Sequence, residues 1–275
     1  MWPARVTPLV ITAHGSPDLR SPATMRRLAG AVGQRWPGPV VTAFLEFNLP
    51  AVPGVLRGLA SPAPIVPGPR EAREYEPASS ARRPARLLDA PTYAREPAPV
   101  LVPALLTRAY HGRVDIPAVL RAAGVPALVA SVLGPAGPGE EPDPLLLAAL
   151  RRRLSELYTT FDGLALIAAG TRVEAARDTV RATARALGAS LGVPCEVGFA
   201  SATPPSGADA VRALRRRGAT RIVASSYFLA AGKLHDIAAT SAREAGAVAV
   251  AAPLADAPEL ADLIVKRAKA ATPPA

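Results

Sequence analysis

The sequence predicts an α/β fold made of two tandem, flavodoxin-like, doubly wound domains, each built on a parallel sheet. Short apolar strands alternate with amphipathic helices along the whole chain of 275 residues, and the second half of the chain repeats the first. Such alternation favours parallel strands joined by right-handed crossovers. The chain is also long enough for two domains that each bury a core of their own.

The expected strands are short apolar runs bounded by turn residues. In the first half they are Leu9 to Ala13, Val40 to Leu45, Pro99 to Leu105 and Ala127 to Val132, and in the second half Leu164 to Ala168, Cys195 to Ala200, Arg221 to Ser225 and Ala247 to Ala251. Helical periodicity fills the stretches between them. Ser21 and Pro22 are typical N-cap and first-turn residues, so we expect a helix from there to about Trp36, with a twin helix from Ala175 onward.

The internal repeat separates scaffold residues from chemical ones. The segment from Pro39 to Leu59 aligns without gaps with Pro194 to Leu214, at an offset of 155 residues. At the same offset His14 becomes Ala169 and Glu46 becomes Ser201. A repeat that keeps its scaffold and loses its ionisable residues in one copy indicates that those residues work in the other copy.

The repeat also predicts the domain boundaries. We expect an N-terminal domain over residues 1–144 that holds the catalytic residues, and a degenerate C-terminal repeat over residues 145–275. Beyond Leu105 the offset falls to 123 residues, so the first copy carries 32 additional residues, near positions 60–98. This insertion contains eight prolines, which favours a flexible surface loop over a substrate lid.

Composition narrows the class of protein. Hydrophobic residues make up 49% and charged residues 20%, a globular balance, and no apolar run approaches the ~20 residues of a membrane-spanning helix. Residues 1–10 lack the pattern of a signal peptide, so we expect a cytoplasmic protein without a membrane partner. The net charge of +10 is compatible with nucleic acid, but aromatic residues are only 4% and no nucleic-acid motif is present. Solvated helix faces, or a polyanionic small molecule, explain the charge better.

Three ionisable residues follow strands of the first half. His14 follows the first strand, Glu46 ends the second, and His111 lies a few residues beyond the third. If the first strand lies between the other two, these side chains converge at the carboxyl edge of the sheet, where ligands bind. Two imidazoles and a carboxylate can ligate a divalent transition metal or accept protons near neutral pH. Glu46 stands among apolar residues, where an ionisable group must be paired or useful. His235 does not align with His111, and we expect a surface histidine at a helix start.

The motifs resemble those of a known family. Ile-Thr-Ala-His-Gly-Ser at 11–16, Phe-Leu-Glu-Phe at 44–47 followed by a proline, and His-x-x-x-Asp-Ile-Pro at 111–117 are similar to the sirohydrochlorin chelatases, the cobalt- and iron-inserting class II chelatases, in their long two-domain form. The resemblance implies that a cleft between the halves binds a sirohydrochlorin-like tetrapyrrole, and that His14 and His111 hold the metal with the assistance of Glu46. The implied metal substrate is Co²⁺ or Fe²⁺, for cobalamin or sirohaem synthesis, with no organic cofactor. A monomer is expected, with a dimer as the alternative.

Two alternatives stay open at this point. The same histidines would serve a non-catalytic carrier of a tetrapyrrole or a metal. A histidine phosphatase is the weaker alternative, because its Arg-His-Gly signature would require an arginine where Ala13 stands.

Overall fold

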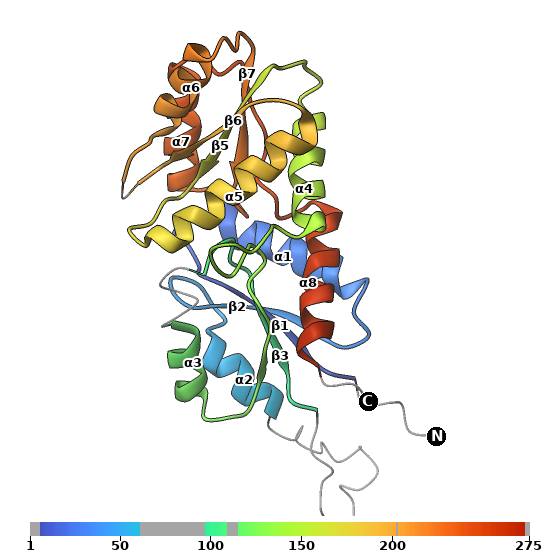
Figure 1. Cartoon of the computed structure of the whole chain (residues 1–275). Coiled ribbons are helices and arrows are strands. Elements are labelled where there is room, and N and C mark those ends of the chain that lie inside the picture. The colour runs from blue at the N-terminus through green and yellow to red at the C-terminus, as the bar shows by residue number, and fades with distance from the viewer. Residues whose placement is uncertain (1–5, 61–96, 109–114, 202, 273–275) are drawn as a thin grey trace, which may run out of the picture.

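The computed structural model describes residues 6–60, 97–108, 115–201 and 203–272. Most of the predicted insertion near 60–98 lies outside the described residues, and so does His111. Within the described residues the chain forms two four-stranded sheets in which every pair of neighbours is parallel. The first sheet has the order β2-β1-β3-β4, and the second has the order β6-β5-β7-β8 (Figure 1). The strands are β1 Leu9–Ala13, β2 Val40–Phe44, β3 Val100–Pro103, β4 Leu128–Val129, β5 Gly163–Ala168, β6 Cys195–Phe199, β7 Ile222–Tyr227 and β8 Ala249–Val250.

The observed order confirms the predicted fold, with the first strand of each half between the second and the third. The helices are α1 Arg20–Gly33, α2 Val52–Ala60, α3 Ile116–Ala123, α4 Pro144–Ser155, α5 Glu174–Leu191, α6 Gly207–Arg216, α7 Lys233–Glu244 and α8 Pro258–Ala271. No helix in the described part of the chain combines the length and the apolarity that crossing a membrane requires.

Strand β1 is buried at every position because helices cover both faces of its sheet. On one face Leu9 and Ile11 belong to the core that also contains residues of α1 and α8. On the other face Val10 packs in the cluster that contains residues of α2 and α3. The continuous apolar run of this strand is therefore the pattern expected of a doubly covered parallel sheet.

The last helix of the described chain, α8, packs on the sheet of the first half, whereas α4 packs on the sheet of the second half. Figure 1 shows α8, in red, beside the first sheet, although it ends the described chain, and α4, in green, beside the second. Helix α8 contacts α1 and β3, whereas α4 contacts α5 and β7, and the two helices also contact each other. The predicted boundary between residues 144 and 145 lies at the start of α4. The polypeptide thus passes from one half to the other at α4 and again at α8.

Polar contacts reinforce this packing. Asp143 caps α4 by accepting a hydrogen bond from the backbone of Leu145 and forms an ion pair with Lys266 of α8 at 2.7 Å. Burial works against ionisation of Asp143, yet the hydrogen bonds from Lys266 and Leu145 leave its pKa below the ordinary value. Tyr227 of β7 donates a hydrogen bond to the carbonyl of Leu106 in the first half at 2.9 Å. These contacts bind the halves together.

The start of α1 differs from the prediction. The helix begins at Arg20 and ends at Gly33, and the position before it, Leu19, provides no side-chain cap. Ser21 is therefore not the N-cap. Instead, the carboxylate of Asp18, three residues before Ser21, accepts a hydrogen bond from the backbone N–H of Arg20 at 3.0 Å. An acidic side chain thus satisfies one of the free N–H groups at the helix start.

Candidate functional site

His14 and Glu46 meet at the carboxyl edge of the first sheet. His14 directly follows β1 and Glu46 lies just beyond β2, and Ala13 and Phe44 are partners in the register of these strands. The Nε2 atom of His14 lies 4.0 Å from Oε2 of Glu46. The two side chains are 35% and 53% exposed, so both are open to an incoming ligand.

This geometry corrects the sequence argument for Glu46. Its apolar neighbours in the sequence do not bury it, because they belong to β2 and to an exposed loop. The residue is more than half exposed and faces an imidazole. The carboxylate of Glu46 is therefore not a buried charge that needs a partner, and the argument from burial does not apply to it.

The backbone holds the two loops together. The N–H of Glu46 donates to the carbonyl of His14 at 2.9 Å, and the N–H of Ser16 donates to Oδ1 of Asn48 at 2.8 Å. Gly15 has a φ of +95°, and a Cβ atom there would overlap the carbonyl oxygen of Glu46. Only glycine permits this close approach without strain. Gly15 therefore permits the close approach of the two loops that carry His14 and Glu46.

The second half repeats the conformation of these loops but has Ala169 and Ser201 in place of His14 and Glu46. The N–H of Ser201 donates to the carbonyl of Ala169 at 3.1 Å, at the positions that correspond to Glu46 and His14. Gly170 repeats the positive φ of Gly15, and Leu49–Pro50 and Pro204–Pro205 are both cis peptides. A cavity of about 210 Å³ opens beside Ala169, and its described lining residues include no carboxylate or histidine. The structure thus repeats the backbone of these loops in both halves, whereas His14 and Glu46 occur only in the first.

His111, the third residue predicted for the site, lies outside the described residues. Strand β3 precedes it and pairs with β1 on the side opposite β2. Within residues 6–60, 97–108, 115–201 and 203–272, no group of three His, Cys, Asp or Glu side chains lies close enough to hold a metal ion. A metal site with three such ligands here would therefore need a residue outside the described ones, and the convergence of His14, Glu46 and His111 stays a prediction.

His235 is not a surface histidine. It lies in the first turn of α7, as predicted, but its side chain is only 12% exposed. Its Nε2 lies 3.1 Å from Oγ of Ser226 and its Nδ1 lies 3.2 Å from Oδ1 of Asp236. The ring also meets Phe228 edge-on, with centroids 5.3 Å apart. The prediction was wrong because Ser226 and Phe228, at and just beyond the end of β7, cover this turn of the helix, and sequence patterns do not show such a tertiary contact.

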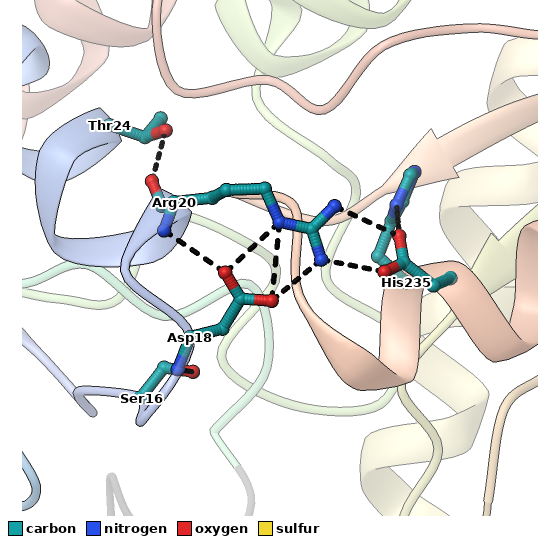
Figure 2. A network of polar contacts seen from close by, with 6 residues as sticks. Ser16, Asp18, Arg20, Thr24 and His235 are labelled. Atoms are coloured by element: carbon teal, nitrogen blue, oxygen red, sulfur yellow. Dashed lines mark hydrogen bonds and ion pairs between the residues drawn. The ribbon is translucent and has the colours of Figure 1, made fainter.

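Figure 2 shows the polar network that joins His235 to the loop that follows His14. Arg20 donates to Oδ2 of Asp18 and to Oδ2 of Asp236, each at 2.6 Å. Hydrogen bonds from the side chain and the backbone of Arg20 lower the pKa of Asp18 to about 2, and the Arg20 side chain also lowers the pKa of Asp236. Sequence analysis missed this link because Arg20 and Asp236 are 216 residues apart.

Comparison with known proteins identifies the family. The model of the CbiX family matches residues 8–68 and 163–271, well over half of the chain. The first matched segment contains His14 and Glu46, whereas His111 falls between the two segments. We found no match among curated proteins.

Solved structures share the fold. SirB from Bacillus subtilis with Fe³⁺ superposes with a TM-score of 0.69 at 16% identity, over 96% of this chain and 94% of that one. The sirohydrochlorin chelatase SirB from Bacillus subtilis subspecies spizizenii in complex with cobalt gives 0.65 at 15% identity, with the same coverage of 96% and 94%. CbiX, the terminal enzyme for siroheme biosynthesis in denitrifying bacteria, gives 0.58 at 20% identity, over 97% and 100%. The two sheets share one strand order, and the family model matches residues of both. The chain therefore belongs to the CbiX family, as its motifs indicated.

Proposed function

We propose that the protein is a sirohydrochlorin chelatase, which inserts Co²⁺ or Fe²⁺ into the tetrapyrrole for cobalamin or sirohaem synthesis. The observation that carries this proposal is the pair of His14 and Glu46, 4.0 Å apart at the open edge of the first sheet, in a member of the CbiX family. The similar folds of SirB with Fe³⁺ and SirB with cobalt support a metal as substrate.

The site residues fit the chemistry of metal insertion. An imidazole nitrogen is a good ligand for cobalt and iron, and a carboxylate oxygen can assist it. We propose that His14 and His111 ligate the metal substrate and that Glu46 supports them. Because His14 and Glu46 are both partly exposed, the metal can enter and leave without a large rearrangement.

Insertion of a divalent metal releases two protons from the pyrrole nitrogens. The two nitrogens that carry N–H bonds each lose a proton as the metal binds to the ring, so the +2 charge of the metal is balanced by the two protons released. The carboxylate of Glu46, or a neutral His14, would accept these protons as a general base and pass them to water. Both groups lie where the reacting nitrogens must come if His14 delivers the metal.

The surface charge suits this substrate. Sirohydrochlorin is a polycarboxylate, and the chain carries a net charge of +10. Opposite charge raises the rate at which a small anion reaches the protein and weakens as salt screens it. We propose that the protein works as a cytoplasmic monomer whose catalytic residues lie within residues 1–144.

The test is metal insertion by single variants. Purified protein is mixed anaerobically with sirohydrochlorin and either Co²⁺ or Fe²⁺, and the loss of the metal-free absorption bands is followed against a control without enzyme. We expect His14→Ala and His111→Ala to abolish acceleration, and Glu46→Gln to slow it by roughly a hundredfold. Glu244→Gln, an exposed carboxylate at the end of α7, is the matched control and should retain the wild-type rate. Wild-type rates in a folded His14→Ala protein would overturn the proposal.

The same experiment separates the alternatives. A carrier would bind the tetrapyrrole or the metal without exceeding one metal inserted per chain. The alternative of a histidine phosphatase is disfavoured, because Ala13 stands at the position of the signature arginine and is a buried residue of β1.

A further inference from the structure

We propose that three exposed apolar side chains on the two loops that carry His14 and Glu46 form a platform for the flat face of the tetrapyrrole. These are Leu19, Phe47 and Leu49, called the apolar platform below, and Phe47 is the positioning residue that sets the macrocycle over His14. This inference rests on the proposed function and adds the surface that would bind the organic substrate.

The platform exposes large apolar groups where the candidate site lies. Leu19, Phe47 and Leu49 are 80%, 65% and 79% exposed. They come from the two loops that the hydrogen bonds from Glu46 to His14 and from Ser16 to Asn48 hold together. Large exposed apolar side chains on the loops of a candidate site are typical of a binding surface, because a ligand that covers them removes apolar area from water.

Phe47 is held in an unusual conformation beside His14. Its φ of +61° lies in the left-handed region, which an aromatic residue rarely adopts. Its ring meets the imidazole of His14 edge-on, with centroids 5.9 Å apart and an interplanar angle of 82°. The ring therefore touches the proposed metal ligand and still keeps most of its surface open to solvent.

The second half shows that the loop fold does not need these side chains. At the offset of 155 residues, Leu19, Phe47 and Leu49 correspond to Glu174, Ala202 and Pro204. The hydrogen bonds of the loop are nevertheless kept, from Ser201 to Ala169 and from Thr203 to Ser201. The apolar platform is therefore absent from the same copy that lacks His14 and Glu46, which ties the platform to their function.

The chemistry of a tetrapyrrole matches this arrangement. Its macrocycle presents a wide apolar π face, which gains from contact with aromatic and aliphatic side chains, and it carries carboxylates at its edge. A ring lying on the apolar platform would keep its carboxylates toward water and its central nitrogens close to His14. Transfer of a metal from His14 into the ring requires this face-on approach.

The decisive measurement compares tetrapyrrole binding with metal binding in Phe47→Ala. We expect this variant to weaken binding of metal-free sirohydrochlorin, followed by its absorption spectrum, by roughly tenfold, and to raise KM more than it lowers kcat. Calorimetric affinity for Co²⁺ alone should stay at the wild-type value. Phe47→Trp should restore tetrapyrrole binding. Tyr158→Ala is the matched control, because Tyr158 is 94% exposed and also has a positive φ, but it lies in the loop between α4 and β5.

The outcomes distinguish this inference from the proposed function. If the wild type inserts metal and Phe47→Ala binds the tetrapyrrole as tightly as Tyr158→Ala does, the apolar platform is refuted and the chelatase proposal stands. If the wild type binds the tetrapyrrole without accelerating insertion, the chelatase proposal fails, and weaker binding by Phe47→Ala still supports the platform. Loss of Co²⁺ affinity equal to the loss of tetrapyrrole affinity would mean that Phe47 only supports His14, which also refutes the platform.

Discussion

His14 and Glu46 gain their proximity from one glycine and two strand ends. Adjacent parallel strands β1 and β2 end together, and the loops that follow are pulled close by the hydrogen bond between the backbones of Glu46 and His14. The offset repeat and the position after each strand were sufficient to predict this pair from the sequence. The 4.0 Å separation, and the exposure of Glu46, depend on loop geometry that sequence patterns do not describe.

The close approach of these loops leads to a prediction for Gly15. Gly15→Ala forces a Cβ onto the carbonyl of Glu46 at a φ of +95°, so we expect the free energy of unfolding to fall by at least about 2 kcal/mol. The displaced Glu46 should also lower the rate of metal insertion by the protein that remains folded. Denaturant unfolding and the insertion assay measure the two effects.

Gly170→Ala is the matched control for this variant. Gly170 has a φ of +90° and its Cβ would meet the carbonyl of Ser201, so the same strain arises in the half without the ionisable pair. We expect comparable destabilisation with an unchanged insertion rate. Equal losses of activity in both variants would contradict a role for the Gly15 turn in placing the site.

At the scale of elements, the start of α1 is joined to the start of α7. Arg20 shares its guanidinium between Asp18 of its own loop and Asp236 of the opposite half. His235 extends this link to Ser226 of β7. The contacts tie the loop that carries His14 to the second sheet, so the position of the site depends on both halves.

This network predicts an acid-sensitive contribution to stability. The pKa values of Asp18 and Asp236 are lowered, that of Asp18 from 3.8 to about 2, so each carboxylate stabilises the fold above its unfolded pKa. That contribution should be lost as the pH falls from about 4 toward 2. We expect Arg20→Ala to flatten the dependence of unfolding free energy on pH in this interval, by a small amount because the groups are exposed. Chemical denaturation at several pH values measures the slope.

Arg212→Ala provides the comparison. Arg212 pairs with Asp209 within one helix, and the pKa of Asp209 is lowered mainly by hydrogen bonds from Ser206, so this variant should keep the wild-type slope. If Arg20→Ala and the wild type show the same slope between pH 2 and 4, the network does not contribute in the way proposed.

For the whole molecule, the packing of α8 on the first sheet and its contact with α4 make the first half dependent on the second. Helix α8 covers the sheet of the first half, and its buried residues share a core with Leu9 and Leu28. The first half therefore cannot cover its sheet with contiguous residues alone, because it needs α8 from the end of the chain. This dependence is a property of the whole chain and not of either predicted domain.

We accordingly expect one cooperative unfolding transition rather than two. In a Trp2→Phe background, the fluorescence of the buried Trp36 reports on the first half and far-UV circular dichroism on both, and the two denaturation curves should coincide. Ile264 is fully buried in α8, so Ile264→Ala should lower the free energy of unfolding obtained from each curve by about 2–5 kcal/mol. Separate midpoints for the two probes would show that the halves unfold independently.

The fold, and the pairing of two of the three candidate site residues, followed from local patterns and the repeat. The strands of the second sheet were predicted within a few residues, because buried apolar runs and turn residues are properties of short segments. The strand order that a flavodoxin-like domain would have, with the first strand between the second and the third, is the order observed. Ser21 was wrongly predicted as the cap of α1, since Asp18 competes for the same helix start and sequence preference alone does not rank them.

By itself, the sequence determined the α/β class, the tandem repeat, the family and the identity of the ionisable residues at the strand ends. Periodicity, spacing and residue type are properties of the sequence itself, and they do not depend on what packs around each segment. Only the tertiary structure decided that α8 covers the first sheet, that His235 is largely covered by the end of β7, that Arg20 bridges the halves, and that Phe47 stands exposed beside His14. Those features depend on surfaces brought together from distant parts of the chain, and the free energy of such contacts is decided by their assembled geometry.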